Sequence, residues 1–369
     1  MYGCFGLVLM ATHACNLRCR YCYGGEKTDR SMPMVVAFTA IDRAVRSISP
    51  GGTLELGFFG GEPLLRAELI SQVIEYARES TSLAGFSLKL SMTTNGTLNS
   101  ETARAVMTMP EMELSISHDG LPEVHDRYRV DCNGGGTSSR VLGTIDRLQE
   151  EGHEPRVVMV VRPDTVESLP EGIAFLQSRG VRYIAPSLDL WAEWNQADAE
   201  RLRDSLVRCA DLWHAGLPQR SISWFDEKAA RLAAVPISET ARCGFGDGEI
   251  AVAPSGNLYP CERLIGADEA DSPMRLPGHA LDGTRFDGTT AAERSAPACT
   301  DCAISDQCNT TCRCSNYIRS GRIDRPDGLL CMLDSVCYSE TARVLGMLPM
   351  ESEPAASCSQ DESETRGAI

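Results

Sequence analysis

Residues 5–25 read FGLVLMATHACNLRCRYCYGG, an apolar run followed at once by three closely spaced cysteines. Cys15, Cys19 and Cys22 have the spacing C-x3-C-x2-C. Three thiolates can hold three irons of a four-iron cluster and leave the fourth iron without a protein ligand, open for chemistry. A zinc knuckle or three unrelated buried thiols are the alternatives. The strand-like run at 5–11 favours the cluster, because it places the cysteines on a loop at a strand end.

The composition argues against several other classes of protein. The chain has 369 residues, a formal net charge of −16 and no apolar run of membrane-spanning length. We expect no binding to nucleic acid or to an acidic membrane, since both require a surplus of lysine and arginine. The N-terminus lacks the basic region of a signal peptide. The 16 cysteines, mostly in tight groups, therefore predict metal or iron–sulfur ligation in a reducing cytoplasm rather than disulfides.

The first 190 residues alternate between strand-like and helical patterns, which predicts parallel strands joined by right-handed crossovers. Six such units are fewer than the eight of a closed barrel. The expected strands are 5–11, 54–59, 87–93, 112–117, 156–161 and 181–187, and the expected helices are 35–48, 64–80, 100–107, 138–151, 166–179 and 198–215.

The alternation ends after about residue 235, where glycine, proline and cysteine become dense. Ten of the 16 cysteines lie from Cys243 onward. We therefore expect a first domain at 1–235, a small cysteine-rich domain at 236–348, and a disordered acidic tail at 349–369.

A second motif, GGEP, follows the second expected strand, within GFFGGEPLL at 57–65. Alone it would indicate only a turn. Here GGEP lies one strand–helix unit after the C-x3-C-x2-C motif. The two motifs in this order resemble those of the radical S-adenosylmethionine (SAM) superfamily. The resemblance implies an α/β fold, a partial (β/α)6 TIM-like barrel, with Cys15, Cys19 and Cys22 holding a [4Fe-4S] cluster. The residues expected to contact SAM are Tyr21, Gly60, Gly61, Glu62, Pro63, Thr94, Asn95, Ser117 and Arg129.

The resemblance also implies a reaction. An electron from a flavodoxin or ferredoxin would cleave SAM to a 5′-deoxyadenosyl radical, which abstracts hydrogen from the substrate. The glycines of GGEP would allow the backbone to approach SAM closely. A backbone carbonyl of this segment or the Glu62 side chain would accept hydrogen bonds from the SAM ammonium. Arg129 would pair with its carboxylate. We interpret His13, His118 and His125 as loop residues, because the radical mechanism requires no histidine.

The later cysteines form a second framework, which resembles the SPASM domain found behind many radical SAM barrels. It extends over about residues 243–337 and implies two auxiliary [4Fe-4S] clusters, three clusters in all. The outer one would be held by Cys299, Cys302, Cys308 and Cys331. The inner one would be held by Cys243, Cys261 and Cys312, with Cys314, another thiol or no protein group as fourth ligand. Two zinc ribbons are the alternative.

The resemblance implies an oxidoreductase that modifies a peptide or protein. One hypothesis is maturation of a ribosomally made peptide through a thioether, a carbon–carbon crosslink or another oxidation. Leader recognition could then fall to a separate protein, because the chain begins shortly before its first strand. The other is sulfatase maturation, which oxidises serine or cysteine to formylglycine. Sulfatase-maturating enzymes have an aspartate that acts as the catalytic base at the position where this chain has Glu262. Glu262 remains a candidate base, and its extra methylene argues against the sulfatase role.

Two readings outside peptide modification also stay open. One is a non-catalytic iron–sulfur electron carrier or redox sensor, which would explain the cysteines but not GGEP. The other is a small-molecule dehydrogenase built from the same domains.

Overall fold

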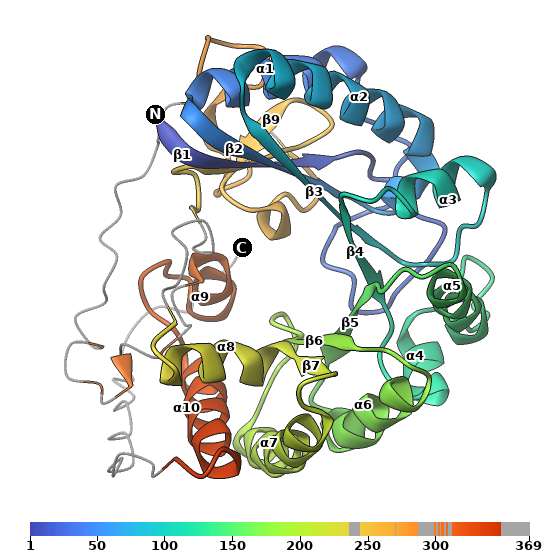
Figure 1. Ribbon diagram of the computed structural model, residues 1–369, viewed down its shortest axis with the longest axis vertical. Helices are drawn as coiled ribbons and strands as arrows, with labels where there is room; N and C mark the ends of the chain where they lie inside the picture. Colours follow the sequence, from blue (N-terminus) through green and yellow to red (C-terminus); the bar gives the residue numbers. More distant parts are fainter. Residues whose placement is uncertain are drawn as a thin grey trace.

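The fold is that of an open, curved sheet covered on its outer side by helices (Figure 1). The computed structural model describes residues 1–235, 244–269, 271–286, 299, 302, 304–305, 308 and 312–347. Seven strands follow one another in chain order and pair in parallel: β1 (Tyr2–Met10), β2 (Ile48–Phe59), β3 (Ser87–Thr94), β4 (Met112–Ser117), β5 (Arg156–Val161), β6 (Tyr183–Leu188) and β7 (Ser221–Ile222).

Helices fill the connections between these strands. They are α1 (Met34–Ser47), α2 (Ala67–Ala84), α3 (Glu101–Met107), α4 (Pro122–Tyr128), α5 (Ser138–Glu150), α6 (Leu169–Ser178), α7 (Gln196–Gly216) and α8 (Ser223–Leu232). The six expected strands and six expected helices are confirmed, with ends that shift by a few residues. Helix α4, strand β7 and helix α8 were not expected.

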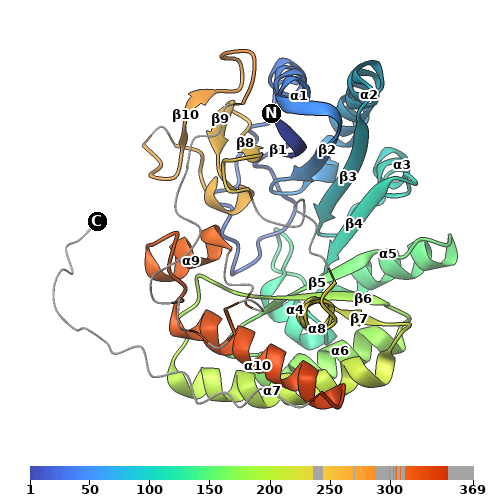
Figure 2. The same cartoon turned by 60° about the vertical axis from the view of Figure 1, so that its left-hand side comes forward.

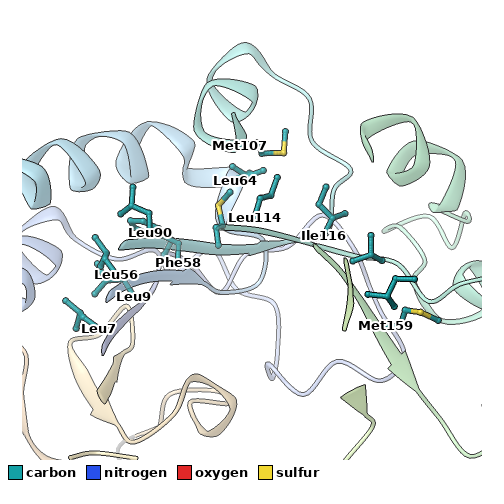
Figure 3. Packing of buried hydrophobic residues seen from close by; sticks show 14 of the residues in the cluster. Leu7, Leu9, Leu56, Phe58, Leu64, Leu90, Met107, Leu114, Ile116 and Met159 are labelled. Atoms are coloured by element: carbon teal, nitrogen blue, oxygen red, sulfur yellow. The ribbon is translucent and has the colours of Figure 1, made fainter. Parts of the chain in front are cut away.

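The two faces of the sheet differ in chemistry, because successive side chains of a strand point to opposite sides. Leu7, Leu56 and Leu90 are register partners on adjacent strands and belong to the core between sheet and helices (Figure 3). The alternate positions Val8, Gly57 and Ser91 are also register partners, and they line a cavity on the other face. The strands therefore direct their leucines toward the helices, and the opposite, inner face is more polar and contains a cavity.

The C-terminal region continues the same sheet. Strand β8 (Glu249–Val252) pairs in parallel with β1, and β9 (Asn257–Tyr259) and β10 (Leu276–His279) follow in antiparallel order. Figure 2 shows these strands beside β1, and α9 (Arg313–Ser320) and α10 (Gly328–Val344) at the other end of the region. Helix α10 packs against α7 and α8. The division into domains at about residue 235 stays a prediction.

Among the described residues, no helix is long and apolar enough to cross a membrane. The expected acidic tail at 349–369 lies outside the described residues, and so does Cys243.

Candidate active site

The three N-terminal cysteines lie on a loop that leaves the C-terminal end of β1. Backbone hydrogen bonds close its base, from His13 N to Arg30 O at 2.8 Å and from Met32 N to Ala11 O at 2.9 Å. Two more backbone bonds join the loop to the end of α4 and the segment that follows it, from Arg20 N to Tyr128 O and from Arg18 N to Val130 O. The cysteines are therefore presented by a loop whose backbone is fixed on two sides.

Nitrogen donors face the sulfurs of this loop. Cys15 Sγ accepts from Leu17 N at 3.4 Å and from Asn95 Nδ2 at 3.8 Å, and Lys27 Nζ lies 3.0 Å from Cys22 Sγ. Such donors stabilise thiolates and tune the clusters that thiolates bind. The loop therefore fits an iron–sulfur cluster. Among the described residues, no three or more His, Cys, Asp or Glu side chains are grouped so that they could hold one metal ion.

The three thiols also influence one another. Burial, together with the neighbouring Cys22 and Cys15, raises the pKa of Cys19 to about 11 against the opposing effect of Arg129. Burial likewise raises the pKa of Cys15. The thiols of Cys15 and Cys19 are therefore expected to stay protonated until a metal binds and displaces the protons.

The GGEP segment packs directly against the cysteine loop. Gly61 N donates to Thr12 O and Glu62 N to Ala14 O, both at 2.8 Å. A Cβ atom on Gly61 would lie 2.3 Å from Ala14 O, and one on Gly60, where φ is +150°, would lie 2.5 Å from Thr12 O. The two glycines are thus required for the close approach of two protein loops, a role that the sequence analysis did not assign to them.

The Glu62 carboxylate is fully buried and accepts three hydrogen bonds from the protein. The donors are Leu64 N at 3.0 Å, Thr94 Oγ1 at 2.7 Å and Asn95 N at 2.7 Å. Burial raises the pKa of Glu62 to about 6, against the opposing effect of these donors. Glu62 thereby ties the turn that begins at Pro63 to the end of β3, and it orients Asn95 toward Cys15.

A buried ion pair stands on the opposite side of the cysteine loop. Arg129 Nε lies 3.2 Å from Asp119 Oδ2, and Tyr21 donates its hydroxyl to the same oxygen at 2.5 Å. The guanidinium also lies 5.3 Å from the centre of the Tyr21 ring. The structure thus brings Tyr21 and Arg129 together, with Ser117 buried nearby at the end of β4. Asp119, two residues beyond that strand, was not among the residues expected to contact SAM.

His13 and His118 lie in loops as expected, whereas His125 lies in α4; His118 and His125 are fully buried, with ring centres 4.2 Å apart. His125 Nδ1 accepts from Asp119 N, and His125 Nε2 contacts Thr137 Oγ1 at 2.9 Å. Thr137 in turn donates to Arg129 O at 2.7 Å. Burial lowers the pKa of His118 to about 3 and that of His125 to about 2. Neutral histidines therefore support both members of the Asp119–Arg129 pair.

The C-terminal cysteines gather in two groups. Cys312 and Cys314 have their sulfurs 3.3 Å apart, and Cys261 packs with them in one buried cluster. Cys314 therefore occupies the neighbourhood of the expected inner group, whereas the position of Cys243 is not described. The second group lies around Cys331, whose thiol interacts electrostatically with Cys308, Cys299 and Cys302.

A cavity of about 300 Å³ lies on the inner face of the sheet. Hydroxyl and charged side chains from β3, β4 and β5 contribute to its wall, together with Phe59 and Glu262. Glu262 directly follows Cys261, so the C-terminal region supplies a carboxylate to a cavity formed mainly by β1–β5. A substrate group in this cavity would meet the carboxylate of Glu262 as a proton acceptor.

Part of the chain is similar to a known protein family, and longer stretches are similar to individual proteins. Residues 9–176 match the family model of the Radical SAM superfamily. The chain is 26% identical over 277 residues to a cysteine-type anaerobic sulfatase-maturating enzyme of Clostridium novyi, covering 70% of this chain and 73% of the relative. It is 25% identical over 276 residues to a serine-type enzyme of Klebsiella aerogenes, covering 69% and 65%.

Two groups of solved structures have the same fold. Native anSMEcpe with bound AdoMet and Cp18Cys peptide matches with a TM-score of 0.75 at 20% identity, covering 93% of this chain and 98% of that one. Streptococcus suis SuiB bound to precursor peptide SuiA matches with a TM-score of 0.60 at 17% identity, covering 88% and 75%.

Proposed function

Because residues 9–176 form a radical SAM domain, we propose that this protein is a radical SAM enzyme that oxidises a side chain of a peptide. The observation that carries the proposal is the placement of Glu262 in the wall of the cavity on the inner face of the strands. An electron carrier or redox sensor needs no such cavity. Structures of the same fold contain bound peptides, which supports a peptide rather than a small molecule as substrate.

Cys15, Cys19 and Cys22 would hold a [4Fe-4S] cluster, and SAM would bind beside it. When bound, the cluster supplies the electron that cleaves SAM to the hydrogen-abstracting 5′-deoxyadenosyl radical. Arg129 is suited to the SAM carboxylate, because it is buried beside the cysteine loop and pre-oriented by Asp119. Among the described residues, no protein acceptor lies within hydrogen-bonding distance of its two terminal nitrogens.

The role of Glu62, Thr94 and Asn95 would be to position the SAM site, since their hydrogen bonds to one another hold the cysteine loop against β3. Ser117, Gly60, Gly61, Pro63 and Tyr21 complete the proposed SAM site. Glu262 would accept the proton that the substrate loses as it is oxidised.

We further propose two auxiliary clusters that take up the electron from the oxidised substrate. Cys299, Cys302, Cys308 and Cys331 would hold the outer cluster, and Cys243, Cys261 and Cys312 the inner one. The sulfur contact between Cys312 and Cys314 supports Cys314 as the fourth inner ligand. A flavodoxin- or ferredoxin-type protein would supply electrons, and a separate protein could present the peptide.

Two outcomes for the substrate compete. One is a thioether or carbon–carbon crosslink in a ribosomally made peptide. The other is formylglycine at a serine or cysteine, which the curated relatives favour because they are named as sulfatase-maturating enzymes. A hydrazide reagent distinguishes the two products, since it captures the aldehyde of formylglycine and does not react with a crosslink.

The first test needs no substrate. The reconstituted protein should contain about twelve irons per chain, at four per cluster, and should release 5′-deoxyadenosine from SAM when dithionite is added. Cys15→Ala should abolish that release. An electron carrier would give no 5′-deoxyadenosine, and about four irons per chain would refute the two auxiliary clusters.

A further inference from the structure

Three aromatic rings form a nearly parallel stack beside the candidate active site. Tyr23 stacks on Trp191 with ring centres 4.4 Å apart and an interplanar angle of 6°. On its other side Tyr23 faces Phe59 at 6.3 Å and 14°. The rings come from three distant segments: Phe59 ends β2, Tyr23 directly follows Cys22, and Trp191 lies three residues beyond β6.

The stack leads from the cavity to the molecular surface. Phe59 contributes to the cavity wall, and Tyr23 interacts electrostatically with Arg263 and Glu262 of the C-terminal region. Trp191, at the outer end, is 44% exposed. Tyr23 covers one face of the indole, so the accessible area of this large apolar side chain lies on the remainder of the ring.

The segment that carries Trp191 is held rigidly. Asp189 Oδ1 accepts from Trp191 N at 3.1 Å and from Ala192 N at 3.2 Å. From the other side, Arg319 of α9 donates to Leu190 O at 3.2 Å and to Ala192 O at 2.9 Å. An indole fixed in this way loses little conformational entropy when it binds a partner, which favours its use as a contact surface.

We propose that Trp191 is a docking platform for an apolar or aromatic residue of the peptide substrate. The proposal rests on the proposed function, because the peptide must enter the cavity that the stack leads to. The ring centres of Phe59 and Trp191 lie at most about 11 Å apart, since they are 6.3 Å and 4.4 Å from that of Tyr23, and this is roughly the length of three extended residues. The platform therefore takes the residue about three positions away from the one that is oxidised.

The test uses two synthetic 18-residue peptides, each with one central cysteine. The third residue on either side of the cysteine is phenylalanine in one peptide and alanine in the other. Their affinities for the cluster-loaded, SAM-bound protein are measured by fluorescence anisotropy. We expect the wild type to bind the phenylalanine peptide about five-fold more tightly, within the range for an aromatic pair. Trp191→Ala should remove this preference, and Trp191→Phe should restore most of it.

Tyr183 provides a matched control, because it is also 44% exposed but lies at the opposite end of β6. Tyr183→Ala should keep the full preference. A Trp191→Ala protein that still prefers phenylalanine would overturn the platform, and so would a wild type that binds both peptides equally. If the wild type shows the preference but oxidises neither peptide, the platform stands and the proposed function fails. Binding of neither peptide would overturn both.

Discussion

A buried ion pair joins the C-terminal helix to the barrel, and its removal allows a quantitative test of the fold. Lys228 Nζ of α8 lies 2.6 Å from Asp334 Oδ1 of α10, with side chains 2% and 9% exposed. Asp334→Asn would leave the ammonium buried opposite a neutral amide. Removing one member of such a pair costs about 3–5 kcal/mol, because the remaining charge keeps its desolvation penalty and loses the attraction of the removed charge.

Replacing both partners gives a different expectation. Lys228→Met combined with Asp334→Leu removes both charges and refills the space, so its stability should lie within about 1 kcal/mol of the wild type or above it. The exposed pair Arg343–Asp211 joins α10 to α7 at 2.8 Å and serves as the matched control. Asp211→Asn should cost about 0–1 kcal/mol.

The measurement is urea unfolding followed by far-ultraviolet circular dichroism, with iron content determined in parallel. Helix α10 also carries Cys331, so Asp334→Asn should lose iron at urea concentrations that leave the double variant loaded. A cost below about 1 kcal/mol for Asp334→Asn, equal to that of Asp211→Asn, would show that the pair is hydrated and that our reasoning is wrong.

Three further predictions concern the site. Gly61→Ala should prevent assembly of the N-terminal cluster, because its Cβ would meet Ala14 O at 2.3 Å; retained visible absorbance of that cluster would contradict the close contact. Stability should fall on acidification below pH 6.5, because His118 and His125 stay neutral in the folded protein but bind protons when unfolded. The loss is about 3 kcal/mol at pH 5.5 for the two together, measured by urea unfolding at pH 7.5 and 5.5. Cys314→Ser should lower iron content by about one cluster if this thiol is an inner ligand, and unchanged iron would exclude it.

Local patterns in the sequence were sufficient for the first six strands and their helices. Each strand combines a short apolar run with turn residues at its ends, and the helices repeat at 3.6 residues. The pattern gave no sign of α8, or of β7 with its two residues. It also gave no sign that β8 would pair with β1, because pairing between residues about 240 positions apart depends on the assembled fold rather than on local sequence.

The candidate site was predictable where one motif holds all the residues and less so where distant segments meet. Cys15, Cys19 and Cys22 share one loop, so their spacing was informative. The contact of Tyr23 with Trp191 joins residues 168 positions apart, and neither ring belongs to a motif. The loop prediction failed for His125, which lies in α4, because a list of required catalytic groups says nothing about residues that support an ion pair. His125 is explained only by its hydrogen bonds to Asp119 and Thr137.

The pairing of β8 with β1 has a consequence for how the protein can be divided. Strand β1 leads directly into the loop with Cys15, and β8 leads through β9 to Cys261. The separation of the two cysteine regions is therefore set by a hydrogen-bonded ladder rather than by a flexible linker. A chain cut after residue 235 would also expose the edge of β1, which invites strand-to-strand aggregation. The C-terminal region thus behaves as a structural part of the barrel wall, and a transplant onto another barrel would have to carry a matching first strand.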